Sequence, residues 1–365
     1  MQRMATLRWL TAGESHGPGL TVIVEGTPAG LALSEDLLRV DLARRQQGYG
    51  RGGRQRIETD HARIVGGVRH GLSTGAPIAL WIENKDFPHW QDDMSVSVPD
   101  APPKPVTRPR PGHADLAGAL KYRTHDLRNV LERASARETA ARVAAGAIAR
   151  ALLLTCGIEV LSRVLSIGGT RFGDPAATHG RIFEAAREGT TLGGSFEVWA
   201  PGVPPGLGSY AQWDLRLDGR LAQALMSIPA IRAVSLGDGL QIADETGQEA
   251  HDTIAYADGE FVRLSNRSGG VEGGVSNGEN IVVRAWMKPL PTQKRELPSI
   301  DLVSKLPVDA LNERHDICAV ESAAVIGEAM MCLTLAATLL ETFGGDSMSA
   351  LHEAFSGHRA ALEVF

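Results

Sequence analysis

The sequence predicts an α+β fold in which helices and strands form separate layers. Two alanine-rich, apolar segments, 131–154 and 321–342, have the composition of helices that are buried on most of their faces. Segments rich in β-branched residues lie before and between them, without a regular alternation of strand and helix. Because a doubly wound parallel sheet needs that alternation, we expect a layered structure with the helices inside.

Composition and charge exclude several classes of protein. The chain has 365 residues, 43% of them hydrophobic and 22% charged, which is ordinary for a globular protein. This length supports a sizeable core and by itself suggests about two domains, although one large domain also fits. The formal net charge of -6 argues against a general nucleic-acid binder. A basic cluster in such a chain is therefore expected to be local and to serve a specific task.

The cysteines and the apolar segments indicate a cytoplasmic protein with no membrane partner. Cys156, Cys318 and Cys332 show no C-x-x-C spacing, which indicates reduced thiols and neither a disulfide framework nor a zinc site. The N-terminus lacks the apolar core of a signal peptide. The most membrane-like stretch, 323–340, contains Glu328 and many small residues, so we interpret it as a buried core helix.

Local signals predict the first elements of the chain. Strands are expected at 20–27, where β-branched residues cluster, and at 77–84. Between them, the segment 34–48 carries helix signals: Ser34 as N-cap, acidic residues in the first turn, arginines in the last turn, and Gly48 as terminator.

The middle of the chain combines a proline tract with the clearest helix. The segment 99–111 holds six prolines and is either an extended domain linker or a loop that delivers His113 to a site. The helix expected at 131–154 contains Ser135 and Glu138 in the S-x-x-E spacing of a capping box.

The second half is expected to supply further strands, at 195–202 and 280–289. Between them, the segment 265–279 contains two glycine pairs. Glycine permits left-handed backbone and close approach to a ligand, but it equally suits plain turns. This pattern alone does not decide between the two.

Positive charge is concentrated near the end of the first predicted helix. Arginine presents a planar fork of donors that pairs with phosphate or carboxylate and stays charged at any working pH. A solvated or nucleic-acid-contacting loop is one interpretation of this cluster, and an anion-binding site is the other. Its five arginines are Arg44, Arg45, Arg51, Arg54 and Arg56.

Three further clusters contain groups suited to proton transfer or anion binding. Histidine, with a pKa of about 6.5, can move protons near neutral pH, and a helix N-terminus favours negative charge. Together with Lys288, these clusters predict a site for a small, multiply anionic molecule, but their spacing does not specify a reaction. They match no P-loop, Rossmann fingerprint or nucleophile elbow. The clusters are His16 in "GESHGPG", Arg110, His113 and Asp115 in "RPGHAD" with Arg133 and Ser135 in "ERASARET", and Arg314, His315 and Asp316 in "ERHDICAVE".

At these clusters the sequence resembles the chorismate synthase family. The matching motifs follow the family's order from residue 13 to about 320. The resemblance implies a single domain over 1–365, built as a β-α-β sandwich with helices buried between two antiparallel sheets, and a homotetramer. The motifs are "GESHGPGL", "RRQQGYGRG", "RPGHAD", "RASARETAARVAAGAIA", "SIPAIRAVSLGDG", "SNRSGGVEGG", "MKPLPT" and "RHDICAV".

The resemblance also implies a reaction. It is the anti-1,4-elimination of phosphate from 5-enolpyruvylshikimate 3-phosphate, which yields chorismate for aromatic amino acid biosynthesis and makes the enzyme a carbon-oxygen lyase. Reduced FMN is the implied cofactor: it lends an electron that weakens the C–O bond, its N5 takes the hydrogen, and the electron returns. The substrate carries a phosphate and two carboxylates, which require an arginine-lined pocket.

The resemblance assigns roles to individual residues. His16 would protonate the departing phosphate, His113 would hold or protonate the flavin near N1, and Asp316 would act as base toward flavin N5. No metal is implied. The implied substrate-binding residues are Arg45, Arg51, Arg54, Arg110 and Ser135. The implied flavin-binding residues are Arg133, Ala134, Ser135, Pro229, Ala230, Gly273, Lys288, Pro289, Leu290, Pro291, Thr292 and Arg314.

Two positions depart from the family pattern. Pro229 stands where the family often has Asn or Gln, which removes a side-chain hydrogen bond and a backbone donor. Ile317 stands where many members have Pro, next to the predicted base Asp316.

Two alternatives remain open from the residues alone. A flavin-independent lyase or phosphotransferase acting on a sugar phosphate would use the same arginines. A nucleic-acid-binding protein would use 44–56 and 104–110, with steeply salt-dependent binding, but the acidic net charge opposes it. The source of reduced flavin also stays open: some relatives reduce it with NADPH, whereas this compact chain favours an outside source.

Overall fold

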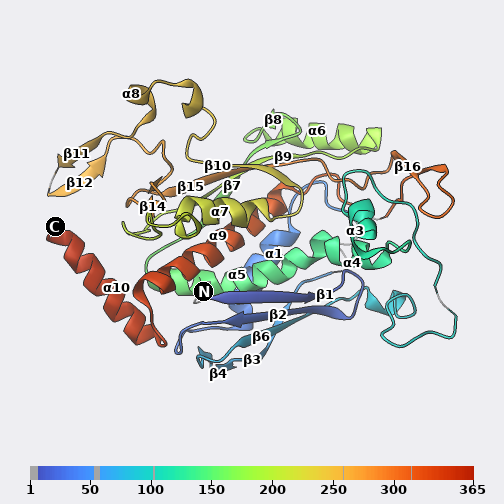
Figure 1. Cartoon of the computed structure of the whole chain (residues 1–365), viewed down its shortest axis with the longest axis horizontal. Helices are drawn as coiled ribbons and strands as arrows, with labels where there is room; N and C mark the ends of the chain where they lie inside the picture. The colour runs from blue at the N-terminus through green and yellow to red at the C-terminus, as the bar shows by residue number, and fades with distance from the viewer. Residues whose placement is uncertain (1–6, 53–57, 102, 258, 314) are drawn as a thin grey trace.

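The protein forms three layers in a computed structural model that describes residues 7–52, 58–101, 103–257, 259–313 and 315–365. Figure 1 shows a four-stranded sheet at the bottom, a layer of helices in the middle and a five-stranded sheet at the top. All strand pairs within these two sheets are antiparallel. The expected α+β sandwich with helices between two antiparallel sheets is confirmed, while the single domain over 1–365 stays a prediction.

The four-stranded sheet contains the first two predicted strands. In both, alternate residues are buried, because successive side chains of a strand point to opposite faces and one face covers the helices. The predicted segments 20–27 and 77–84 correspond to β2 and β6. The strands, in sheet order, are β1 (Arg8–Gly13), β2 (Gly19–Glu25), β6 (Ile78–Glu83) and β3 (Ala62–Gly66).

The five-stranded sheet contains the other two predicted strands, since 195–202 corresponds to β9 and 280–289 to β15. Its strands, in sheet order, are β10 (Ile231–Leu236), β15 (Ile281–Met287), β9 (Gly194–Ala200), β7 (Leu161–Ile167) and β8 (Thr170–Arg171). Short hairpins outside the two sheets are β4 (Val68–Arg69) with β5 (Leu72–Ser73), β11 (Ile254–Ala257) with β12 (Glu260–Arg263), β13 (Val271–Glu272) with β14 (Val275–Ser276), and β16 (Pro298–Ile300) with β17 (Pro307–Asp309).

The middle layer consists mainly of α1 (Glu35–Gln46), α5 (Thr139–Thr155) and α9 (Val320–Phe343). Helix α5 packs against β2 of one sheet, α9 packs against β7 and β9 of the other, and the two helices pack against each other (Figure 1). Their small residues permit this close approach: a Cβ at Gly146 would overlap Ala329. The remaining α-helices are α3 (Asp115–Tyr122), α4 (Arg128–Ala134), α6 (Pro175–Glu188), α7 (Leu217–Met226), α8 (Gly247–Ala250) and α10 (Met348–Glu363).

Helix α9 is a core helix. By length and composition alone it could cross a membrane, with a mean hydropathy of 1.9, but 89% of its most apolar window is buried inside the fold. Its Glu328 is fully buried and accepts hydrogen bonds from Arg44, Arg150 and Ser162. These partners compensate the cost of burying a charge. The interpretation of 323–340 as a buried helix is confirmed, and the cytoplasmic location stays a prediction.

Local capping accounts for the start of α1. Ser34 accepts a hydrogen bond from the backbone N–H of Leu37 at 3.2 Å, as predicted for an N-cap. The helix ends at Gln46, and Gly48 follows with a φ of 117° that favours glycine. Arg44 and Arg45 thus close the helix, and Arg45 comes to lie beside the cavity described below.

The continuous helix predicted over 131–154 is wrong. Helix α4 ends at Ala134, Ser135 has extended backbone, a 3₁₀ turn spans Ala136–Glu138, and α5 begins at Thr139. Ser135 caps the short turn by accepting from the N–H of Arg137, but the predicted capping box does not form. The Glu138 carboxylate instead accepts from Thr11 and Arg142, since these tertiary partners outcompete the local pairing.

Candidate active site

One cavity of about 510 Å³ gathers the sequence clusters that were singled out for chemistry. Its volume falls within the range of about 300–1,000 Å³ that is typical of ligand pockets. Within the described segment 103–111, the proline tract runs without helix or strand and leads directly to His113 at the cavity. The predicted site residues that line the cavity are His16, Arg45, Arg51, Arg110, His113, Ala134, Ser135, Pro229, Ala230, Lys288, Leu290, Pro291, Thr292 and Asp316.

Two predicted residues have structural partners away from the cavity lining. Arg133 donates to the backbone oxygens of Thr11 and Gly13 at 2.9 and 3.0 Å, which fastens α4 to the end of β1. Gly273 forms the turn between β13 and β14, where its carbonyl accepts from Arg216 at 3.0 Å. The second glycine pair of this segment thus forms a turn, whereas Gly269 and Gly270 lie close to the backbone of Gly237 and Asn280.

Pro289 is not part of the cavity lining, although its neighbours Lys288 and Leu290 are. Arg54 and Arg314 lie outside the described residues. The roles that the resemblance assigns to these residues stay predictions.

Two arginines of the cluster, Arg45 and Arg51, turn inward rather than toward solvent. Arg45 is only 4% exposed and pairs with Asp60 at 3.1 Å, while the side chain of Arg51 is 9% exposed and pairs with Asp316 at 3.0 Å. Burial, aided by the neighbouring Arg137 and Arg51 and opposed by Asp60, lowers the pKa of Arg45 from 12.5 to about 10. Inward-facing guanidinium groups favour the anion-site hypothesis over a solvated or nucleic-acid-contacting loop.

Arg51 also has an unsatisfied donor. Its Nε is buried and has no hydrogen-bond partner among the residues that the structure describes. Since buried donors are nearly always hydrogen-bonded in native proteins, this N–H fits an oxygen of a bound anion. Lys288 adds a cation to the cavity lining. It donates to the backbone oxygen of Gly112, and burial, together with Arg232, lowers its pKa.

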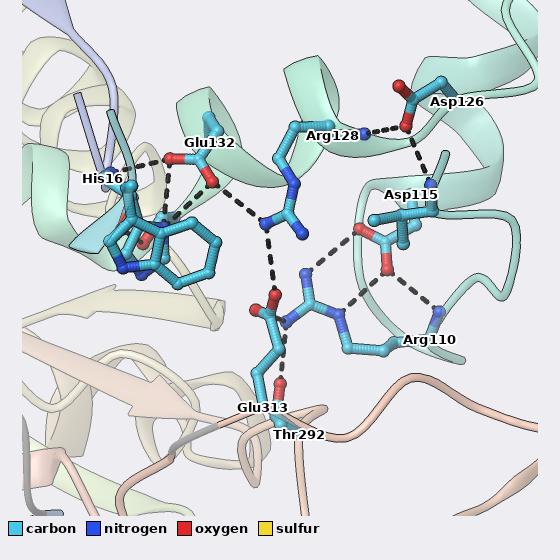
Figure 2. Close-up of polar contacts among 12 residues, drawn as sticks. His16, Arg110, Asp115, Asp126, Arg128, Glu132, Thr292 and Glu313 are labelled. Carbon is cyan, nitrogen blue, oxygen red and sulfur yellow. Dashed lines mark hydrogen bonds and ion pairs between the residues drawn. The ribbon is translucent and has the colours of Figure 1, made fainter. Parts of the chain in front are cut away.

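His16 is held on several sides (Figure 2). Its backbone N–H donates to Oε2 of Glu132 at 2.7 Å, and its Nδ1 lies 2.9 Å from Oε1 of the same carboxylate. Trp90 stacks on the imidazole with the ring centroids 4.0 Å apart. A carboxylate on Nδ1 fixes the tautomer of a neutral imidazole, so that Nε2 is the nitrogen suited to exchange protons with a ligand.

Glu132 stays ionised in this setting. Burial alone would raise its pKa, but the hydrogen bond and charge of His16, the backbone N–H of His16 and the Arg128 side chain together lower it below 4.5. Arg128 lies 3.3 Å from Glu132 and also lies over the Trp90 ring, 5.1 Å from its centroid.

His113 has a parallel arrangement. Its Nδ1 pairs with Asp115, which is fully buried and also accepts from the backbone N–H and Nε of Arg110, both at 2.9 Å. Burial alone would raise the pKa of Asp115, but the hydrogen bonds from His113 and Arg110 hold it well below its usual value. Arg110 donates as well to Thr292 at 2.9 Å, so much of its donor capacity is used within the protein.

Asp316 joins the loop before α9 to the arginine cluster. Its Oδ1 accepts from the backbone N–H of Gly52 at 2.6 Å, and its Oδ2 pairs with Arg51. The departure at Ile317 has a structural consequence: its N–H donates to the carbonyl of Gly50 at 2.8 Å, and a proline there could not make this bond. The two loops are thus joined through both side chain and backbone.

Several site residues were missed by the sequence analysis. Glu132 lies one residue before the motif residue Arg133, and its proximity to that motif was the available signal. Trp90 and Arg128 occur in segments without a recognised pattern and reach the cavity region only through the fold. Glu313 is the first residue of the "ERHDICAVE" cluster, and its proximity to Asp316 was the available signal. Ser15, whose hydroxyl lies 3.0 Å from that of Ser135, was also missed. Within the described ranges, no group of three or more His, Cys, Asp or Glu residues is placed to hold a metal ion.

Comparison with known proteins identifies relatives along nearly the whole chain. The family model of chorismate synthase matches residues 7–340. A chorismate synthase of Moorella thermoacetica is 52% identical over 380 aligned residues, which cover 98% of this chain and 99% of the relative. One of Desulforudis audaxviator is 53% identical over 384, covering 98% and 97%. A crystal structure of chorismate synthase matches with a TM-score of 0.78 at 40% identity and covers 98% of this chain and 99% of that one.

Proposed function

The chain belongs to the chorismate synthase family, and from that premise we propose that it eliminates phosphate from 5-enolpyruvylshikimate 3-phosphate to form chorismate. The reaction is a carbon-oxygen lyase step of aromatic amino acid biosynthesis, carried out in the cytoplasm by a homotetramer. The observation that carries the proposal is the meeting, at one cavity, of two histidine–carboxylate pairs with buried arginines.

The cationic side of the cavity suits the charges of this substrate. The substrate bears one phosphate and two carboxylates, and Arg45 and Arg51 are desolvated cations at the cavity wall. An arginine that has lost its water gains most from a bound anion, because the local dielectric constant is low. The unpartnered Nε of Arg51 adds a directed donor. We assign substrate binding to Arg45 and Arg51, together with Arg110 and Ser135, which also line the cavity. The same role is proposed for Arg54, which is not among the described residues.

The part of the cavity wall that combines apolar side chains with Lys288 fits reduced FMN. The apolar side chains, which include Ile228, Met287 and Ile326, offer a surface for a flat ring system, and Lys288 offers a positive charge. When bound, reduced FMN supplies the electron that weakens the C–O bond and the acceptor for the ring hydrogen, without net oxidation. Pro229 contributes packing to this wall but no N–H. The residues that would hold the flavin are Arg133, Ala134, Ser135, Pro229, Ala230, Gly273, Lys288, Pro289, Leu290, Pro291, Thr292 and Arg314.

The protein's own groups handle the protons. One C–O and one C–H bond break, one C=C bond forms, and inorganic phosphate departs. His16, with Nδ1 held by Glu132, donates a proton to the departing phosphate from Nε2. Asp316 takes up the proton that the ring hydrogen finally yields, and its pairing with Arg51 keeps it at the cavity. His113, held by Asp115, would hold or protonate the flavin ring.

The assay follows phosphate release under anaerobic conditions with dithionite-reduced FMN and the shikimate ester. We expect one phosphate and one chorismate for each ester consumed, and no turnover with oxidised FMN alone. An absence of phosphate release with reduced FMN would refute the proposed function. Replacing dithionite by NADPH in the same assay tests whether the protein itself reduces the flavin with NADPH. We expect no turnover, because the compact chain favours flavin that is reduced by an outside source.

A further inference from the structure

The two histidines of the proposed mechanism are backed by the same three-part arrangement, of which Figure 2 labels His16, both carboxylates and both arginines. In each, the imidazole Nδ1 pairs with a carboxylate, and that carboxylate forms an ion pair with a guanidinium group. The carboxylates are 1% and 0% exposed, so both negative charges are buried and need their partners. We call the arrangements the His16 set, formed by His16, Glu132 and Arg128, and the His113 set, formed by His113, Asp115 and Arg110.

One glutamate joins the two sets. Oε1 of Glu313 lies 3.5 Å from Nη1 of Arg128, and Oε2 lies 3.6 Å from Nη1 of Arg110. Figure 2 shows this carboxylate between the two guanidinium groups. Both separations are ion pairs longer than a hydrogen bond. Glu313 belongs to the loop before α9, three residues ahead of Asp316, and its side chain is 27% exposed.

The two arginines transmit the position of Glu313 to the histidines. Arg128 acts on His16 by two routes. It pairs with Glu132, and it lies over Trp90, which stacks on the imidazole. Arg110 is 8% exposed and contacts Asp115 through both its backbone and its side chain. A shift of either guanidinium group therefore moves a carboxylate that orients an imidazole.

The charges show what Glu313 contributes. The two guanidinium groups approach the same carboxylate, so without its negative charge two cations would face each other in a partly buried space. Charges in such a space repel strongly, because water screens them poorly. Loss of the Glu313 charge is thus expected to push the arginines apart and to disturb both histidine–carboxylate pairs together.

We propose that Glu313 is a positioning residue that aligns His16 and His113 through Arg128 and Arg110. Its effect on turnover rests on the proposed function, because the roles of the two histidines do. Its effect on the imidazoles does not, because the ion pairs exist without substrate. The proposal therefore has one kinetic and one ligand-free test.

The kinetic test uses Glu313→Gln, which keeps the shape of the side chain and removes its charge. We expect kcat for phosphate release to fall about 10- to 100-fold, the scale of a small misplacement of catalytic groups, with KM changed less than about 3-fold. In a His16→Ala background the same change is expected to cost much less, because one of the two groups it aligns is already gone. An equal loss in both backgrounds, or no loss at all, would overturn the proposal.

The matched control is Glu341→Gln. Glu341 also pairs with an arginine, Arg220 at 2.6 Å, but neither residue lines the cavity. We expect this variant to keep wild-type kcat, and far-UV circular dichroism to show that both variants are folded. A similar loss of kcat in Glu341→Gln would show a general effect of charge and would contradict a positioning role for Glu313.

The ligand-free test records the imidazole nitrogens of protein labelled with ¹⁵N-histidine, with signals assigned from His16→Gln and His113→Gln. We expect Glu313→Gln to shift the Nδ1 and Nε2 signals of both histidines, and Glu341→Gln to shift neither. Unchanged signals in Glu313→Gln would overturn the proposal. If wild-type protein releases no phosphate while these signals shift, the proposed function fails and the positioning role stands.

Discussion

Two of the places where the molecule buries ionic side chains differ in how completely the charges are paired. The first, which we call the core network, surrounds Glu328 between α1, α5 and β7. The second surrounds the cavity. In the core network Arg44 and Arg150 each contact both Asp41 and Glu328 at 2.6–2.8 Å. At the cavity, Arg51 keeps a buried N–H without a partner among the described residues.

This difference separates structural from functional use of the same side chains. The core network is satisfied from within, and a buried thiol beside it, Cys332, has its pKa raised to about 12 by burial, opposed by Arg150. No group there is prepared to bind or react. The cavity instead holds a desolvated Arg45 and histidines whose Nδ1 atoms are fixed by carboxylates. Of these two regions, only the cavity contains a buried arginine donor without a partner among the described residues.

The largest effect is expected on the cavity side, on activity without loss of fold. His16→Ala and His113→Ala should each lower turnover by roughly 10²–10⁴, the usual contribution of a proton-transfer group. The measurement is phosphate release with reduced FMN, with far-UV circular dichroism to show that the variants are folded. Wild-type rates in either variant would contradict the role assigned to that histidine.

The next effect is expected in the core network, on stability. Glu328→Ala leaves the partly buried Arg44 and Arg150 with one partner fewer, and removal of one member of a buried ion pair costs about 3–5 kcal/mol. Urea unfolding monitored by circular dichroism measures the loss. Arg51→Ala is the matched change at the cavity, where we expect KM for the shikimate ester to rise and stability to change much less. Equal destabilisation by both would remove the distinction between the two regions.

The smallest effect is expected from acid. The pKa values of Glu132 and Asp115 are depressed in the folded state, so their contribution to stability is complete above the unfolded values of 4.5 and 3.8 and is lost as pH falls below them. Each carboxylate can then remove at most about 1.4 kcal/mol per pH unit. Urea midpoints should therefore stay constant from neutral pH to about pH 5.5 and then fall, less steeply in Glu132→Gln. If the urea midpoint of Glu132→Gln fell with pH as steeply as that of the wild type, ionised Glu132 would not stabilise the fold.

Much of the fold could be predicted from local sequence. All four predicted strand segments form strands, because the preference for a strand depends largely on the composition of a few neighbouring residues. The segments are 20–27, 77–84, 195–202 and 280–289. The break between α4 and α5 could not be predicted, since an alanine-rich stretch favours a continuous helix. Tertiary contacts override this preference: Glu138 pairs with Thr11 of β1, and Ser135 meets Ser15.

The candidate site was predicted in its residue types and motifs but not in its connections. Arginines, histidines and the motif order indicated an anion site and a family. Arg133 shows the limit: the flavin contact that its motif position implied stays a prediction, and no motif indicated that its guanidinium group donates to the backbone of β1.

The sequence by itself determined that 20–27, 77–84, 195–202 and 280–289 form strands, that two apolar helical segments are buried, and which chemical groups are available. Those properties depend on neighbours a few residues apart along the chain. Only the tertiary structure decided that Glu313 lies between Arg110 and Arg128, and that Glu328 is fully paired whereas Arg51 is not. Pairing of charges far apart in sequence depends on how the layers pack, and no local pattern encodes that distance.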